Sequence, residues 1–305
     1  MKPNSTKLRS YLKKILIVGI LLVTIILFVR YVQSHPAYVA ELRRTNPSVI
    51  FWIVCVNFII IGAVAVVNHI SALICRIQLE LRESFLLTIY AALANFFGPL
   101  QSGPGVRAAY LKTKYKILLR DFTFVTLIGY GMFACVSALF LVVGVLAWWQ
   151  TLLIVCTALG ASVAVLWLFR RRGNSSGMLS RLHLSRKLFG ILLIATFLQV
   201  SMTAVRYGIE LHSVGANASI GQIISYAGAA NFALFVSITP DGIGIRETFL
   251  LFAQRLHGVS THDIVAASLI DRASYVVFLA ILGIIALSLH AHKRFSTKTV
   301  IKTVT

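Results

Sequence analysis

Long apolar segments separated by short polar ones dominate the pattern of this 305-residue chain. A helix needs about 20 consecutive apolar residues to cross ~30 Å of hydrocarbon. Segments that approach or exceed this length lie at 15–33, 49–72, 122–147, 151–169, 188–209 and 264–289. Two further apolar segments, 84–98 and 220–238, are short or broken. The pattern therefore predicts an all-α, polytopic membrane helical bundle with about six full spans.

Composition supports this interpretation. Hydrophobic residues make up 58% of the chain, charged residues make up 12%, and the mean hydropathy is +0.86. So little polar surface cannot cover a water-soluble globule, and we expect residues 1–305 to form a single integral membrane domain. The first span is expected to be retained, because no small-residue cleavage pattern follows it. The four cysteines show no metal-binding or disulfide spacing, so we expect neither a metal nor a cofactor.

The net charge of +20 is concentrated in short patches between the spans. Of the 29 Lys and Arg residues, 22 lie in the segments 1–14, 72–121, 169–187 and 290–305. Lys and Arg in short loops mark the cytoplasmic side of a membrane protein. We therefore expect these patches and both termini in the cytoplasm, with the chain in the plasma (inner) membrane of the cell. Patches between spans do not indicate a nucleic-acid partner.

This orientation constrains the two short apolar segments. The span at 49–72 enters a basic patch and the span at 122–147 leaves one, so residues 84–106 must begin and end on the cytoplasmic side. By the same reasoning residues 220–246 must begin and end outside. Each segment is therefore predicted to be a re-entrant helical hairpin. The alternative, two extra full crossings, would place basic patches outside.

A sequence repeat relates the two predicted hairpins. The segment YAALANF at 90–96 reappears as YAGAANF at 226–232, with five of seven positions identical. Each copy is followed by a Gly-rich, Pro-containing break and then by a Gly-x-Arg triplet that ends at Arg107 or Arg246. The same residue types in the same order favour an internal duplication.

Opposite orientations make these copies inverted repeats, one at about 49–147 and the other at about 188–289. The span at 151–169 would connect them. Inverted repeats with broken apolar segments in corresponding positions are typical of transporters, which bind their substrate at the repeat interface.

The two breaks form the first part of a candidate substrate site. Irregular backbone survives at membrane depth only where protein or a water-filled cavity satisfies it, so we expect both breaks to line one cavity. Glycine and proline end helices and leave the N–H groups of the following helix free for an anion such as a phosphate. In the second break the candidate binding residues are Pro240, Asp241, Gly242 and Gly244.

Charged residues next to the second break and inside the last span complete the candidate site. Arg107 and Arg246 could bind an anion through bidentate contacts, or could extend to lipid headgroups. Asp271 and Arg272 lie inside the last span, where an ionisable residue is costly and indicates function. Arg272 could pair with Asp271, with Asp241 or with Glu247. Alternatively, these charges form a buried ion pair that only holds two helices together.

The run ITPDGIGIRE at 238–247, followed by LIDR at 269–272, resembles the Pro-Gly-Gly-x-Gly-x-x-Glu and Asp/Glu-Arg signatures of the lysylphosphatidylglycerol synthase transmembrane-region family. The resemblance extends over about residues 10–290. It implies a membrane protein that moves an aminoacylated or otherwise modified lipid between leaflets. It also implies functional roles for Pro240, Gly242, Gly244, Glu247, Asp271 and Arg272, with Arg107 as the first-repeat counterpart. Asp241 departs from the family, which usually has Gly there.

The expected function is that of an energy-independent lipid flippase for a polar or modified lipid, either aminoacylated or polyprenyl-linked, with membrane lipids as its partners. The alternative is a non-catalytic scaffold that holds a lipid-modifying or glycosyl-transferring enzyme at the bilayer. An enzyme is not expected, because no P-loop, hydrolase or metalloprotease motif is present. The cytosolic aminoacyl transferase domain found in some family members is also absent from this sequence.

Overall fold

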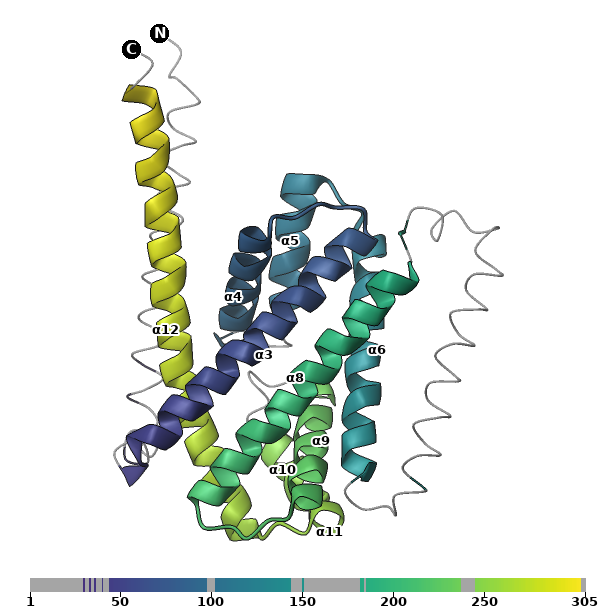
Figure 1. Cartoon of the computed structure of the whole chain (residues 1–305), viewed down its shortest axis with the longest axis vertical. Coiled ribbons are helices and arrows are strands. Elements are labelled where there is room, and N and C mark those ends of the chain that lie inside the picture. The colour runs from purple at the N-terminus through teal and green to yellow at the C-terminus, as the bar shows by residue number, and fades with distance from the viewer. Residues whose placement is uncertain are drawn as a thin grey trace.

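The computed structural model describes residues 44–97, 102–143, 185–236 and 245–302, with a few isolated positions elsewhere (Figure 1). All secondary structure in these ranges is helical. The spans predicted at 15–33 and 151–169 lie outside the described residues, and so do the break residues Pro240, Asp241, Gly242 and Gly244.

The described helices are α3 (Pro47–Ile74), α4 (Leu81–Phe97), α5 (Gly103–Tyr115), α6 (Leu119–Val143), α8 (Arg186–Ser213), α9 (Ile220–Val236), α10 (Ile245–Phe252), α11 (Gln254–His257) and α12 (Thr261–Lys302). Four of them are long and apolar enough to cross a membrane: α3, α6, α8 and the Thr261–Ser288 part of α12. These four helices coincide with four of the spans that the apolar pattern predicts.

Local sequence signals set several helix ends. Asn46 precedes α3 and its side chain accepts the N–H of Ser48 at 3.0 Å. Ser185 caps α8 in the same way by accepting the N–H of Leu188 at 3.2 Å. These caps satisfy N–H groups that have no partner within the helix. Lys116, with φ of 57°, ends α5 in the left-handed conformation that is common at helix C-termini.

Helices α3 and α8 pack side by side through the middle of the molecule, with α12 on one flank and α6 on the other (Figure 1). Helices α4 and α5 lie toward one end of this arrangement, whereas α9, α10 and α11 lie toward the other (Figure 1). The two short-helix groups are therefore separated along the long helices.

Close contacts hold α4 against α5. The Asn95 Oδ1 atom accepts the N–H of Gly103 at 2.6 Å, and the Ser102 hydroxyl donates to the Ala94 carbonyl at 2.5 Å. A Cβ atom at position 103 would lie only 2.6 Å from the Ala91 carbonyl oxygen, so glycine is required there. Asn95, the Asn of the first repeated heptad, thus fixes the start of α5.

Helix α9 approaches α6 equally closely. The Ser225 hydroxyl donates to the Leu141 carbonyl at 2.7 Å, and a Cβ atom at Gly228 would lie 2.7 Å from the Ser137 carbonyl oxygen. Small residues at such a contact let two helix backbones pack tightly inside a membrane.

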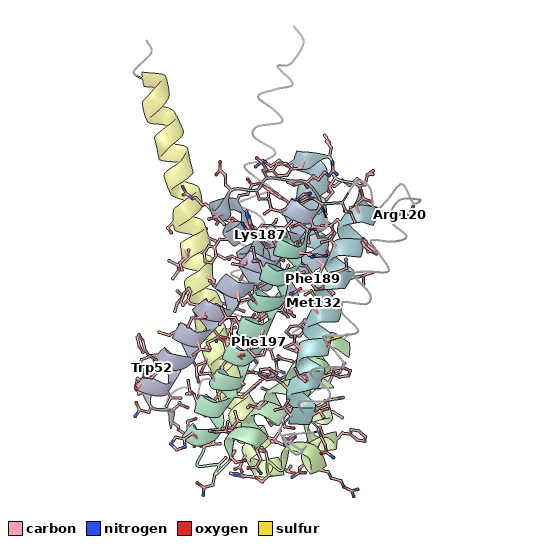
Figure 2. The ribbon with its side chains drawn as sticks, turned by 45° about the vertical axis from the view of Figure 1, so that its right-hand side comes forward. Trp52, Arg120, Met132, Lys187, Phe189 and Phe197 are labelled. Atoms are coloured by element: carbon pink, nitrogen blue, oxygen red, sulfur yellow. The ribbon has the colours of Figure 1, made fainter. Side chains whose placement is uncertain are left out.

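Large apolar side chains also cover the outside of the bundle. Trp52 and Phe197 are more than half exposed, and both lie on the outer surface in Figure 2. Ile194 and Ile284 are exposed to a similar degree. So much exposed apolar surface is unfavourable in water but suits a helix bundle surrounded by lipid.

Candidate functional site

A cavity of about 310 Å³ lies between the long helices, and residues from α3, α4, α5, α6, α8, α9, α10 and α12 line it. Asn95 and Arg107 reach it from the α4–α5 pair, and Asn231 and Arg246 reach it from the α9–α10 pair. Both copies of the repeated sequence therefore contribute to one cavity. Gly103 and Pro104, at the end of the first break, also line it.

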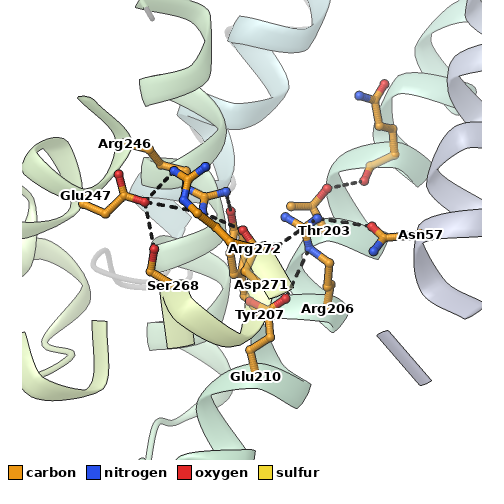
Figure 3. A network of polar contacts seen from close by, with 11 residues as sticks. Asn57, Thr203, Arg206, Tyr207, Glu210, Arg246, Glu247, Ser268, Asp271 and Arg272 are labelled. Carbon is orange, nitrogen blue, oxygen red and sulfur yellow. Dashed lines mark hydrogen bonds and ion pairs between the residues drawn. The ribbon is translucent and has the colours of Figure 1, made fainter. Parts of the chain in front are cut away.

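Asp271 is the centre of a buried ion network on one wall of the cavity (Figure 3). Its Oδ2 atom lies 2.6 Å from an Arg246 guanidinium nitrogen, and its Oδ1 atom lies 3.2 Å from Arg206 Nη1. The three side chains are each at least 90% buried. A carboxylate held between two guanidinium groups is charge-compensated, which is what burial inside a membrane protein demands.

Glu247 forms a second centre beside the first (Figure 3). Its Oε1 atom lies 2.7 Å from Arg272 Nη2 and 3.6 Å from Arg246 Nη2, and it accepts a hydrogen bond from the Ser268 hydroxyl at 2.8 Å. Of the three partners expected for Arg272, the structure thus places Glu247 in hydrogen-bonding contact with it. Glu247 and Arg272 do not line the cavity, so this pair supports Arg246 from the side.

Arg206 joins the network to the long helix α3. Its Nη1 atom donates to Asn57 Oδ1 at 3.2 Å, and its Nε atom lies 3.6 Å from Glu210 Oε1. Arg206 lines the cavity, whereas Glu210 lies one helical turn further along α8 and is fully buried. The guanidinium groups of Arg206, Arg246 and Arg272 therefore share three carboxyl groups, those of Glu210, Glu247 and Asp271.

Arg107 stands apart from this network, on the α5 side of the cavity. It donates from Nη1 to Asn68 Oδ1, interacts with Tyr130, and lies 5.9 Å from the Phe122 ring centroid. No carboxylate pairs with Arg107 in the part of the chain that the structure describes. Among the described residues, the cavity lining therefore carries three guanidinium groups, from Arg107, Arg206 and Arg246, and one carboxylate, that of Asp271.

The two arginines that follow the breaks make corresponding contacts. Arg107 contacts Asn68, and Arg246 contacts the Tyr207 hydroxyl at 3.4 Å. In each case the partner lies 39 residues earlier, on the long helix that begins its repeat.

Three residues of the candidate site were not singled out by the sequence pattern: Asn57, Asn231 and Glu210. Asn57 and Asn231 are each 2% exposed and line the cavity, and the Nδ2 group of each has no hydrogen-bond partner among the described residues. Asn57 is an isolated polar residue in an apolar span, which is the signal that could have identified it. Asn231 belongs to the repeated heptad, but the repeat alone did not indicate that its side chain lines the cavity.

A separate polar cluster lies outside the cavity, where α4 meets α5. The Glu83 carboxylate accepts hydrogen bonds from Lys114 at 2.7 Å, Tyr110 at 2.6 Å and Tyr115 at 3.0 Å. Burial alone would raise the pKa of Glu83, but these hydrogen bonds outweigh burial and lower its pKa below the ordinary value. The cluster therefore joins the two helices by contacts that favour the ionised acid.

The helices and the charged central cavity define a helical membrane protein with a buried polar site. The family model described as Lysylphosphatidylglycerol synthase TM region matches residues 15–283. The chain therefore belongs to this family, as its sequence signatures indicate. Comparison with curated proteins gives no match.

Proposed function

We propose that this protein is a flippase that moves a phosphate-bearing lipid between membrane leaflets. The headgroup crosses through the cavity while the acyl or polyprenyl tails stay in the bilayer. The observation that carries this proposal is the excess of guanidinium groups over carboxylates in the described part of the cavity lining, above all Arg107, which has no carboxylate partner among the described residues.

A buried guanidinium group without a counterion is unfavourable, and an anionic ligand would compensate it. Arginine suits a phosphate because its planar fork can donate two parallel hydrogen bonds. Asn57 and Asn231 offer further unused N–H donors toward the same space. Buried donors without partners are costly, so their clustering around one cavity favours a polar ligand that accepts hydrogen bonds.

The volume of the cavity indicates that only the lipid headgroup enters it and that the tails stay outside. A volume of about 310 Å³ is at the lower limit of small-molecule sites and cannot enclose a whole lipid. The exposed apolar residues on the outside of the bundle provide the surface along which the tails would move.

The proposal includes the inverted, re-entrant topology that the charge pattern predicts. Three observations support it: the α4–α5 and α9–α10 pairs lie toward opposite ends of the long helices, both reach the same cavity, and their arginines make corresponding contacts (Figure 1). Rocking of one repeat against the other would expose the headgroup site to each side in turn. The orientation places both termini in the cytoplasm.

In this proposal Arg107, Arg246 and Asp271 face the headgroup, and Glu247 and Arg272 hold Arg246 in place. Pro240, Asp241, Gly242 and Gly244 remain candidate headgroup contacts on sequence grounds alone. No catalytic step is part of the proposal.

The test is a translocation assay in reconstituted vesicles. Headgroup-labelled phospholipids and a polyprenyl phosphate are compared with a labelled glycolipid that lacks phosphate, in vesicles with and without the protein. We expect faster exchange for the phosphate-bearing lipids only. Rates equal to those of protein-free vesicles for every lipid would contradict a flippase and leave the scaffold alternative.

A further inference from the structure

The proposed transport cycle does not use Glu210, although this residue is the least accessible acid of the described chain. Glu210 is 0% exposed and lies on α8, four residues after Arg206. Its contact with Arg206 is the long ion pair of 3.6 Å. Neither carboxyl oxygen accepts a hydrogen bond from any donor in the described ranges.

The other two acids of the network are held differently. Asp271 has a guanidinium nitrogen at 2.6 Å, and Glu247 has one at 2.7 Å together with a hydroxyl donor at 2.8 Å. A buried carboxylate without hydrogen bonds is strongly disfavoured and takes up a proton instead. The Asp271 carboxylate lies within hydrogen-bonding reach and can accept that proton's hydrogen bond. Glu210 is therefore the acid of this network that geometry favours in the protonated form.

Titratable and charged groups face Glu210 from each helix packed around it. They are Arg206 and Tyr207 on α8, Tyr226 on α9, Arg246 on α10 and Asp271 on α12, while α3 contributes the neutral Asn57 through Arg206. His257 on α11 lies behind them, against the Tyr226 ring.

None of these neighbours replaces Glu210 as a proton site near neutral pH. Phenols ordinarily titrate near pH 10 and guanidinium groups higher still. His257 uses both ring nitrogens, because Nε2 contacts the Leu250 carbonyl at 2.9 Å and Nδ1 accepts the N–H of Val259 at 3.1 Å. Burial lowers the pKa of His257, and the hydrogen bond to Leu250 offsets this only in part. His257 therefore stays neutral.

We propose that Glu210 is a proton-binding site and that a proton on Glu210 removes one of the two carboxylates that neutralise Arg206, which strengthens binding of the lipid phosphate and makes lipid movement proton-coupled. This rests on the proposed flippase function. With all groups ionised, the three arginines and three acids of the network are neutral in sum. A proton taken from water by Glu210 leaves the network with one net positive charge, and Arg206 lines the cavity where the phosphate binds. The proton returns to water when the lipid leaves.

The coupling has a direction. A proton that strengthens phosphate binding must itself be bound more tightly when phosphate is present, because coupling between two sites is reciprocal. Proton and lipid then occupy the same state of the protein and move together. A proton gradient therefore drives the lipid toward the side to which protons flow, which replaces the energy-independent transport expected from the sequence.

The test compares the wild-type protein with E210Q, which carries a neutral side chain at all pH values. In vesicles, the wild-type translocation rate falls as pH rises, by about tenfold per pH unit above the pKa of Glu210. The E210Q rate is independent of pH and does not respond to a proton gradient. The control E80Q makes the same change at an exposed position outside the cavity and keeps the wild-type profile.

Each outcome decides between the two proposals. Wild-type protein that moves lipid equally well at every pH, or E210Q with the wild-type pH profile, overturns proton coupling but leaves the flippase. Wild-type protein that moves no lipid contradicts the flippase itself.

Infrared difference spectra between low and high pH, recorded on the purified wild-type protein, test the proton site without transport. We expect a carbonyl band of a protonated carboxylic acid that shifts in E210D and is missing in E210Q. If E210Q does not fold, the wild-type and E210D spectra still decide, since a wild-type spectrum without this band overturns the proposal.

Discussion

At the residue scale, the site combines compensated and uncompensated charges. Asp271 holds Arg206 and Arg246 at short distances, so this part of the wall is stable without a ligand. Arg107 has only neutral partners among the described residues. In the proposed function, the ion pairs hold Arg206, Arg246 and Asp271 in position at the headgroup site, whereas the charge of Arg107 is left for the ligand to neutralise.

Replacing Asp271 with Asn should therefore destabilise the protein. The change leaves two buried guanidinium groups facing each other, and breaking a buried pair from one side costs about 3–5 kcal/mol. We expect a clear loss of thermal stability in detergent. The control D263N removes the charge of a carboxylate that faces the exposed His262 at 3.4 Å and should cost much less. Equal melting temperatures for both variants would show that the network carries little stability.

At the element scale, the hairpin of α4 and α5 depends on the close approach at Gly103. G103A puts a Cβ atom 2.6 Å from the Ala91 carbonyl oxygen, and backbone cannot move away easily. We expect a loss of about 1–3 kcal/mol of stability from the forced shift. G105A is the matched control two residues later, where a Cβ atom meets nothing within 4 Å. Urea or thermal unfolding of both variants in detergent measures the difference, and a G103A protein as stable as G105A would refute the close approach.

The Glu83 cluster makes the same hairpin sensitive to acid. Because the pKa of Glu83 is lower in the folded protein than in the unfolded chain, its contribution is present above the unfolded pKa. It is lost as pH falls through the folded pKa. We expect the wild-type melting temperature to decrease at acidic pH more steeply than that of E83Q, which lacks this titration. Parallel curves for the two proteins would argue against the cluster.

The sequence indicated the elements well but the pairings poorly. Apolar length predicted α3, α6, α8 and α12, and the repeated heptad contains Asn95 and Asn231 but did not mark either as a site residue. The pairing of Arg206 with Asn57 could not be predicted, because 149 residues separate them and no local pattern relates them. Glu210 was not predicted, because an acidic residue near the polar end of an apolar segment is usually exposed. Its complete burial becomes visible only in the folded structure.

At the scale of the whole molecule, the proposed topology has each hairpin enter and leave on one side of the membrane, the first on the cytoplasmic side and the second on the outer side. Single cysteines at Glu80 and Lys116 flank the first hairpin, and single cysteines at Asn217 and Ser260 flank the second; all four positions are exposed. We expect a membrane-impermeant thiol reagent to label the first pair from the cytoplasm and the second pair from outside. Labelling of either pair from opposite sides would mean full crossings.

The native cysteines could also react with the thiol reagent in that experiment. Cys75 lies just beyond α3, and burial, together with the nearby Asp121, raises its pKa to about 12. Its thiol therefore stays protonated and reacts slowly. The remaining native cysteines are replaced before labelling.

The most direct measurement of the central claim is the translocation rate of a headgroup-labelled phospholipid by R107Q. This variant removes the guanidinium group that a phosphate would neutralise, so we expect the rate to fall by about tenfold or more, the effect of losing roughly 1.4 kcal/mol of a charge-assisted contact. Because the variant also removes a buried charge without a carboxylate partner, the melting temperature should not fall. R120Q, at an exposed position, should retain the wild-type rate. A wild-type rate in R107Q would contradict the claim that the headgroup crosses through this cavity.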